Sequence, residues 1–384
     1  MMQCQKEKFE LSEELHYLNC AYKAPLMKSS EALAIAALKR SRNPVDIKPA
    51  DFFSESKLVR AEFAKIIQTD ALHIAIVPST SYGFSTLFSN IEGKPRGKAI
   101  TVSNEFPSGF FAMKKWCDSH NQTLQIVAED DDLEVQGSDW NRRILEAIDE
   151  DTSVVCMSAI HWSTGYKYAL EEIGEKCRKV GAKFLIDGAQ TIGALPVDVK
   201  KCKIDGLVCA SYKCLLGPYS LALMYVDEYF FDKRPIEEAW MNRADAENFS
   251  SLSNYNMAYE KGAYRFNVGQ TSNFIIMPIL LNGLRQINAW TVEAIQAYCK
   301  ELATPFMTEM ETLGYTFEAE AERCYHLFSV KIGLDNIEKM KSILTEKKLS
   351  LSIRGAFLRI SLSVFNTPED LQVLGEALRS LKTT

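Results

Sequence analysis

Short apolar runs alternate with amphipathic stretches through the first two thirds of the chain. A short, nearly continuous apolar run predicts a strand that is buried on both faces, and apolar residues at helical spacing, as in 170–180, predict a helix. Regular alternation of the two predicts an α/β fold in which helices sandwich a mostly parallel sheet. We expect this large domain to span residues 20–270. The predicted strands are 73–77, 99–102, 124–127, 153–158, 183–187, 206–210 and 221–226.

The pattern changes beyond residue 275, where helical stretches surround two segments that alternate like strands. Thr367 followed by Pro368 is typical of a helix start, with threonine as the cap and proline at the first position. We expect a small α+β domain, formed by residues 1–19 and 271–384, with a boundary between 270 and 290. The predicted elements are a long helix through Leu281 and Trp290 that continues past Val292 to Leu302, strands at 326–332 and 357–362, a helix at 336–346 and the terminal helix.

The composition is ordinary for a globular protein and limits the partners. The 384 residues are 47% hydrophobic and 24% charged, and this length favours more than one domain. A net charge of −6 offers no basic surface, so we expect no nucleic-acid partner. The chain has no apolar signal segment and no run long enough to cross a bilayer, so we expect no membrane contact. Ten cysteines stand singly, away from histidines at metal-binding spacing, which predicts no metal site and a reducing, cytoplasmic compartment.

Two residues at predicted strand ends define the candidate chemistry. Asp187 closes one apolar run, and Lys213 follows the next run 26 positions later (213 − 187). A buried carboxylate needs a cationic partner, which a protonated pyridine nitrogen supplies, and a lysine amine condenses with an aldehyde. The pair predicts a pyridoxal 5'-phosphate (PLP) enzyme, with Lys213 as the Schiff-base lysine and Asp187 as the pyridinium partner. The alternatives are a solvent-exposed lysine and an aspartate that caps the next helix.

Other strand ends carry residues that suit the same cofactor. Thr80 and Ser81 lie where a strand gives way to a helix, and the free N–H groups of a helix start bind phosphate, although most such runs are ordinary caps. Phe106 follows the strand at 99–102 and is expected to stack on the pyridine ring; a core phenylalanine is the alternative. Gln190 is expected to contact the phenolic oxygen of the cofactor.

Arg359 alternates with leucine and isoleucine in an apolar strand near the C-terminus. An arginine in such a strand needs an anionic partner, and its planar guanidinium matches a substrate carboxylate. Arg354 is the rival candidate for this role. A structural salt bridge is the alternative explanation for Arg359.

Together these residues resemble the class V aminotransferase family of fold-type I PLP enzymes, which includes cysteine desulfurases, kynureninase and isopenicillin-epimerase-like proteins. The resemblance implies that Tyr212 donates to the phosphate and that Asn19 lies at the substrate. It also implies a homodimer with shared active sites, in which Gln270 or Thr271 reaches the phosphate of the partner subunit. The matching segments are 17–19, the Ser-Thr loop, 187–190, 212–213, 269–273, 358–361 and 365–367.

The chain departs from the family pattern at two places. Desulfurases carry a cysteine on a loop before the strand with the anchoring arginine, yet the stretch from Leu334 to Arg359 contains none. Persulfide transfer is therefore not expected. Ala159 stands where relatives have a polar cofactor contact, which leaves His161 as a ring contact, a proton relay or a histidine at the edge of the core.

The resulting prediction is an aminotransferase that acts on the α-carbon of a small amino acid. The lack of the desulfurase cysteine favours amino transfer. A β-eliminating C–S lyase resembling cysteine or selenocysteine lyases, or a kynureninase-like hydrolase, is the enzymatic alternative. A binding module that has lost catalysis is the non-enzymatic one, and the joint presence of Lys213 and Asp187 argues against it.

Overall fold

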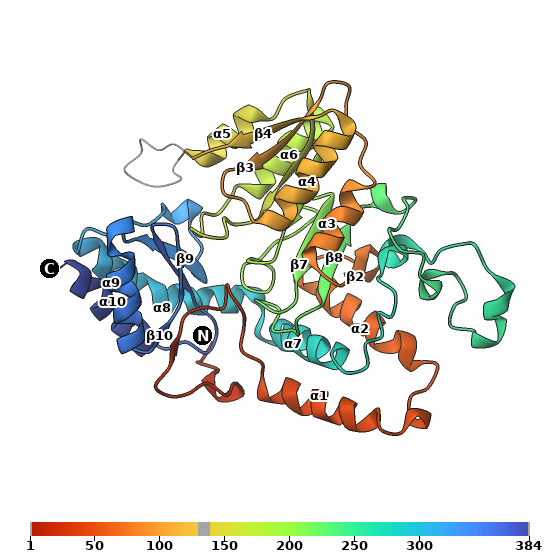
Figure 1. Ribbon diagram of the computed structural model, residues 1–384, viewed down its shortest axis with the longest axis horizontal. Helices are drawn as coiled ribbons and strands as arrows, with labels where there is room; N and C mark the ends of the chain where they lie inside the picture. The colour runs from red at the N-terminus through yellow and green to blue at the C-terminus, as the bar shows by residue number, and fades with distance from the viewer. Residues whose placement is uncertain (1, 130–138, 383–384) are drawn as a thin grey trace.

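The computed structural model describes residues 2–129 and 139–382, and a seven-stranded sheet lies at its centre (Figure 1). Its strands run in the order β2-β8-β7-β6-β5-β3-β4. Strand β8 is antiparallel to both neighbours, and all other neighbours are parallel. The prediction of a mostly parallel sheet is confirmed. The strands are β2 Ile74–Val77, β3 Lys98–Val102, β4 Thr123–Val127, β5 Thr152–Ser158, β6 Lys183–Asp187, β7 Gly206–Ala210 and β8 Ala222–Val226.

Helices cover both faces of this sheet because successive strand residues point to opposite sides. In β7, Leu207 and Cys209 join one apolar cluster, and Val208 joins another. Helices α3 and α4 pack in the cluster of Val208, and α2, α5, α6 and α7 pack in the other. These helices are α2 Asp51–Ile66, α3 Thr80–Phe88, α4 Pro107–His120, α5 Trp140–Ala147, α6 Leu170–Val180 and α7 Met277–Trp290, and α1 Lys28–Arg40 lies at the periphery against α7 (Figure 1).

The C-terminal part contains a three-stranded antiparallel sheet in the order β11-β12-β9, and its apolar side packs on α8 and α10. The N-terminal segment lies beside this part, because β1 pairs with β10 in parallel (Figure 1). In the described ranges no helix has the length and apolar character needed to cross a bilayer. The elements are β1 His16–Tyr17, α8 Val292–Thr312, β9 Leu327–Lys331, α9 Ile337–Glu346, β10 Leu349–Ser350, β11 Ser352–Arg354, β12 Phe357–Ser361 and α10 Pro368–Lys382.

The long helix expected from 275 to 302 is interrupted at Thr291. This residue has φ +68°, and its hydroxyl accepts a hydrogen bond from Ala294 N at 3.2 Å, which caps the start of α8. Helix α7 shares the apolar core of the large sheet, whereas α8 from Tyr298 onward packs in the C-terminal cluster. The domain division near residue 270 stays a prediction; the change of packing itself falls within α8, between Ile295 and Tyr298.

The sheet topology brings the predicted site together at one edge. Strands β2, β3, β5, β6 and β7 run in the same direction, so their carboxyl ends lie along one edge of the sheet. In open α/β sheets this edge faces the ligand crevice. The residues at or just after these strand ends are Thr80, Phe106, His161, Asp187 and Lys213.

Candidate active site

Lys213 lies in a tight turn that follows β7. Two backbone hydrogen bonds close the turn, from Leu216 N to Lys213 O at 2.9 Å and from Gly217 N to Ser211 O at 2.8 Å. The side chain is 5% exposed, which excludes the solvent-facing alternative. Burial lowers the pKa of Lys213, and the negative charge of Asp187 opposes that shift. A buried amine with a lowered pKa is suited to react with an aldehyde as the neutral form.

Asp187 ends β6 as a buried carboxylate that lies within reach of the positive charge of Lys213. Its Oδ1 accepts a hydrogen bond from Ala189 N at 2.9 Å, and among the described residues no lysine, arginine or histidine forms a salt bridge with it. Burial raises the pKa of Asp187. No helix begins in the turns after β6, so the helix-cap alternative does not apply. The site therefore fits a group that brings its own N–H cation, such as a protonated pyridine.

Phe106 lies directly beside Lys213. The Nζ of Lys213 is 5.3 Å from the centroid of the phenylalanine ring. The same ring meets Trp162 edge to face, with centroids 5.6 Å apart. Phe106 precedes Pro107, the first residue of α4, so the backbone that carries the ring is anchored by the start of a helix. The two aromatic rings form a platform next to the buried amine.

Glu105 was missed by the sequence reasoning and ties two strand ends together. Its carboxylate accepts hydrogen bonds from the backbone N–H groups of Phe106 and Ser158, both at 2.6 Å, and from the Ser158 hydroxyl. Ser158 is the register partner of Asp187 across β5 and β6. Burial raises the pKa of Glu105 to about 7. The signal available in the sequence was a carboxylate placed directly after a buried strand, next to the predicted stacking ring.

Arg359 enters the site from β12 of the C-terminal part. It is 2% exposed, its Nη1 donates to Trp162 O at 3.0 Å, and its Nε has no hydrogen-bond partner within residues 2–129 and 139–382. Within the described ranges it makes no salt bridge, so the structural ion pair is not present. A buried guanidinium with an unpaired N–H is costly unless an anion binds there. Arg359 therefore fits an anchor for a substrate carboxylate.

The N-terminal segment forms another wall of the site. Gln190 Nε2 donates to Ala21 O at 3.0 Å, so the predicted phenolate contact is held against this segment. Asn19 is buried, and its Oδ1 accepts from Ser352 Oγ at 2.9 Å. Gln190 thus links the turn after β6 to the N-terminal segment, and Asn19 links that segment to the C-terminal hairpin. Their contacts with cofactor and substrate stay predictions.

Thr80 and Ser81 open helix α3. The cap is Ser79, whose Oγ accepts from Tyr82 N at 3.1 Å and lies 2.9 Å from Ser81 Oγ. The first N–H groups of a helix lack intrahelical partners, so those of Thr80 and Ser81 suit a phosphate. Tyr212 lies half-buried before Lys213, with its ring on the exposed Tyr219 at 4.8 Å. These phosphate contacts stay predictions.

Within the described chain, Gln270 and Thr271 form no hydrogen bond with any of the other residues predicted to bind the cofactor. Gln270 has φ +59° and lies in a surface groove with Phe52 and Trp240, and Thr271 is buried. The predicted contact with a partner subunit stays a prediction for both.

His161 is held inside a turn that follows β5. Its Nδ1 lies 2.9 Å from Thr164 Oγ1, and its ring packs on Trp140 at 5.0 Å. Burial lowers the pKa of His161 to about 4. The imidazole is neutral near neutral pH, which favours a positioning role over that of a proton relay.

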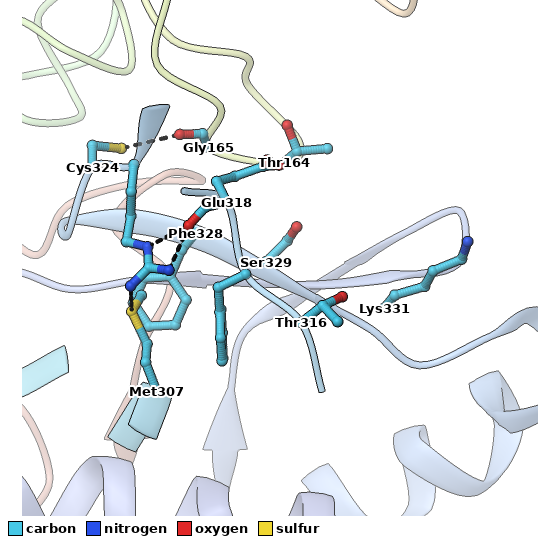
Figure 2. A pocket seen from close by; sticks show the side chains of 11 residues that line it. Thr164, Gly165, Met307, Thr316, Glu318, Cys324, Phe328, Ser329 and Lys331 are labelled. Atoms are coloured by element: carbon cyan, nitrogen blue, oxygen red, sulfur yellow. Dashed lines mark hydrogen bonds between the residues drawn. The ribbon is translucent and has the colours of Figure 1, made fainter. Parts of the chain in front are cut away.

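A separate small cavity of about 60 Å³ lies between this turn and the C-terminal part (Figure 2). Figure 2 shows Cys324 Sγ donating to Gly165 O, a contact of 3.3 Å. Burial and neighbouring carboxylates raise the pKa of Glu318, which lines this cavity, to about 8. The cavity contains none of the predicted cofactor or substrate residues, and it is far smaller than an amino-acid site.

Fold and site together define a fold-type I PLP-dependent enzyme. Lys213, Asp187 and Arg359 would hold the aldehyde, the pyridine nitrogen and a substrate carboxylate. The family model described as aminotransferase class-V matches residues 49–374, and the chain belongs to this family.

Several relatives are similar over most of the chain. The uncharacterized aminotransferase YcbU of Bacillus subtilis (strain 168) is 24% identical over 319 residues, which cover 83% of this chain and 81% of YcbU. The apo cysteine desulfurase of Thermococcus onnurineus NA1 has a TM-score of 0.82 at 17% identity, over 100% of this chain and 99% of its own. The cystine C-S lyase C-DES has a TM-score of 0.82 at 18% identity, over 95% and 97%. In a C-DES mutant, glycine is covalently linked to the PLP cofactor.

Proposed function

We propose that this chain is a PLP-dependent aminotransferase that acts at the α-carbon of a small amino acid. The observation that carries the proposal is the buried pair of Lys213 and Asp187, in which neither group has a salt-bridge partner among the described residues. Arg359, whose Nε has no partner in the part of the chain that the structure describes, supports an amino acid as the substrate. The absence of cysteine from Leu334 to Arg359 supports amino transfer over persulfide transfer.

Each side chain has a distinct task in this proposal. PLP, when bound, supplies an electron sink for negative charge at the substrate α-carbon. Asp187 holds the pyridine nitrogen protonated, and burial away from water strengthens that ion pair. Arg359 orients the substrate carboxylate. Lys213, whose pKa is lowered by burial, would accept the α-proton at Nζ as a neutral amine and would return a proton from the same Nζ.

A β-eliminating C–S lyase is the second candidate. The fold of C-DES matches this chain as well as that of the desulfurase does. A lyase that releases its product directly needs no persulfide-forming cysteine, so the absence of that cysteine does not separate the two reactions. A kynureninase-like hydrolase is the third candidate, because kynureninases are among the relatives that match part of this chain. The reaction must be assigned by its products.

The first experiment compares wild type and Lys213→Ala for PLP binding and turnover. The wild type should show a visible absorbance band that borohydride abolishes, with the cofactor fixed to the peptide that contains Lys213. Amino acids are then supplied with and without a keto-acid acceptor, while pyruvate, ammonia and sulfide are monitored. Product formation that requires the acceptor supports the aminotransferase, and acceptor-independent pyruvate or sulfide supports the lyase. Lack of any PLP band refutes the enzyme proposal.

We further propose that the protein is a homodimer in the cytoplasm. Helix α1 exposes Ile35 and Leu38, with 46% and 56% exposure, three residues apart and therefore on one face of the helix, and contiguous exposed apolar surface is typical of an interface. All ten cysteines are free, which suits a reducing compartment. Sedimentation of the wild type and of Leu38→Glu tests the dimer, because a buried charge at the interface should shift the protein to monomer. A monomeric wild type would refute it.

A further inference from the structure

A second arginine lies beside Arg359 and gives the site two cationic groups. Ser352 is the register partner of Arg359 in the hairpin of β11 and β12. Directly opposed residues point to the same side of a sheet, and so do residues two apart, so Arg354 projects from the same face as Arg359. The Cζ atoms of Arg354 and Arg359 lie 5.9 and 5.7 Å from the ring centroid of Trp162. Two guanidinium groups therefore converge on one indole.

This face of the hairpin is turned toward the active site. The opposite face carries Ile353 and Leu358 into the apolar cluster of the C-terminal part. On the arginine side, Ser352 Oγ donates to Asn19 Oδ1 at 2.9 Å. The Trp162 ring in turn meets Phe106, the ring beside Lys213. A continuous path of contacts thus joins both arginines to the buried lysine.

The two positive charges are not balanced by the described residues. Arg354 Nη1 donates to the neighbouring Ile353 O at 3.1 Å, and Arg359 Nη1 donates to Trp162 O at 3.0 Å. Neither arginine forms a salt bridge with a carboxylate in residues 2–129 and 139–382. Burial, followed by the positive charge of Arg354, lowers the pKa of Arg359 to about 10. Like charges held this close are unfavourable unless anions bind between or beside them.

We propose that the substrate is an acidic amino acid, with its α-carboxylate on Arg359 and its side-chain carboxylate on Arg354. The inference rests on the proposed function and names the substrate class of the same site. Diagonal positions on paired strands are roughly 7–8 Å apart, so the two arginine side chains start far enough apart to hold two separate carboxylates. Trp162 provides the flat apolar surface along which the carbon chain lies between them.

Binding without turnover tests this assignment first. The PLP-loaded wild-type enzyme is titrated by calorimetry with glutarate and with valerate, which differ by one carboxylate. We expect glutarate to bind at least about 10-fold more tightly, because a charge-assisted hydrogen bond contributes about 1.5–3 kcal/mol. Equal affinity for the two compounds would overturn the proposal, and this comparison needs no variant.

Substitution then identifies the residue. Arg354→Met keeps the apolar stem of the side chain and removes the charge, and Lys331→Met removes an exposed charge from β9 of the same sheet. Arg354→Met should lower kcat/KM for aspartate or glutamate about 10- to 100-fold, with less than about 3-fold change for alanine. Lys331→Met should leave both values near wild type. An equal loss for acidic and neutral amino acids would overturn the assignment, and Arg354→Lys should restore part of the preference.

Failure of this inference and failure of the proposed function are distinguishable. A preference for acidic amino acids together with products that form without a keto-acid acceptor refutes amino transfer and leaves the assignment of Arg354 intact. Acceptor-dependent turnover without that preference supports the aminotransferase and refutes the role of Arg354.

Discussion

Replacing Glu105 by glutamine should change how the stability of the cofactor-free protein depends on pH. Burial raises the pKa of this carboxyl from its ordinary value of 4.5 to about 7. Between these values the folded protein holds a proton that the unfolded chain has released, so stability falls as pH rises from about 4.5 and levels off above about 7. The difference amounts to about 3 kcal/mol in full, of which about 2.5 kcal/mol falls between pH 5 and pH 8. Glutamine does not titrate and removes this component.

Urea unfolding at about pH 5 and about pH 8 measures the effect. Glu301→Gln, on the exposed side of α8, is the matched control and should follow the wild type at both pH values. The difference in unfolding free energy between wild type and Glu105→Gln should move by about 2.5 kcal/mol in favour of the variant at the higher pH. Glutamine keeps one acceptor for the Ser158 N–H but loses another hydrogen bond, so only the change with pH is diagnostic. A difference that stays constant with pH would refute the reasoning that burial controls this carboxyl.

Three further predictions test other parts of the structure. Gly165→Ala should destabilise the protein by about 2–4 kcal/mol, because Gly165 has φ +84° and a Cβ there would lie 2.3 Å from Leu327 O. The control Gly181→Ala, at φ +69° with open space around it, should cost only about 1 kcal/mol. Equal urea midpoints for the two variants would contradict the close approach at Gly165. Asp187→Asn should still bind PLP, as measured by absorbance, but its kcat should fall at least about 100-fold. Undiminished turnover would disprove the role of Asp187 as the partner of the pyridine nitrogen. Ser81→Asp should weaken PLP binding at least about 10-fold without lowering Tm, because the aspartate charge stabilises the start of helix α3 but repels the phosphate. Unchanged PLP affinity in a fluorescence titration would count against the phosphate site.

Much of the fold follows from local pattern. The seven predicted strands of the large sheet match β2 to β8 closely. A short buried strand appears in the sequence as an apolar run between turn residues, whichever strands are its neighbours in the sheet. The helix start at Pro368 is also as predicted. The prediction of one helix from 275 to 302 was wrong at Thr291. The helical spacing of apolar residues continues across this position, although the folded chain holds Thr291 at positive φ and so breaks the helix there. The short pairings of β1 with β10 and of β11 with β12 were not predicted, because β1, β10 and β11 are only two or three residues long and too short to show a period.

The candidate site likewise contains residues that local sequence pattern predicts and residues that it does not. Lys213 and Asp187 were found from sequence because each stands at the end of an apolar run with a residue type that chemistry constrains. Glu105 was not, because its hydrogen bonds to Ser158 join strands that are distant in the chain.

The sequence by itself determined the order of strands and helices and the residue types at the strand ends, because periodicity and turn chemistry act over a few neighbouring residues. Only the tertiary structure decided which strands are neighbours, that Arg359 is buried without a salt bridge to any described residue, and that Arg354 lies with it against Trp162. These contacts depend on how the C-terminal hairpin packs on the edge of the large sheet. Packing of this kind minimises exposed apolar area over the whole chain, and no local pattern encodes it.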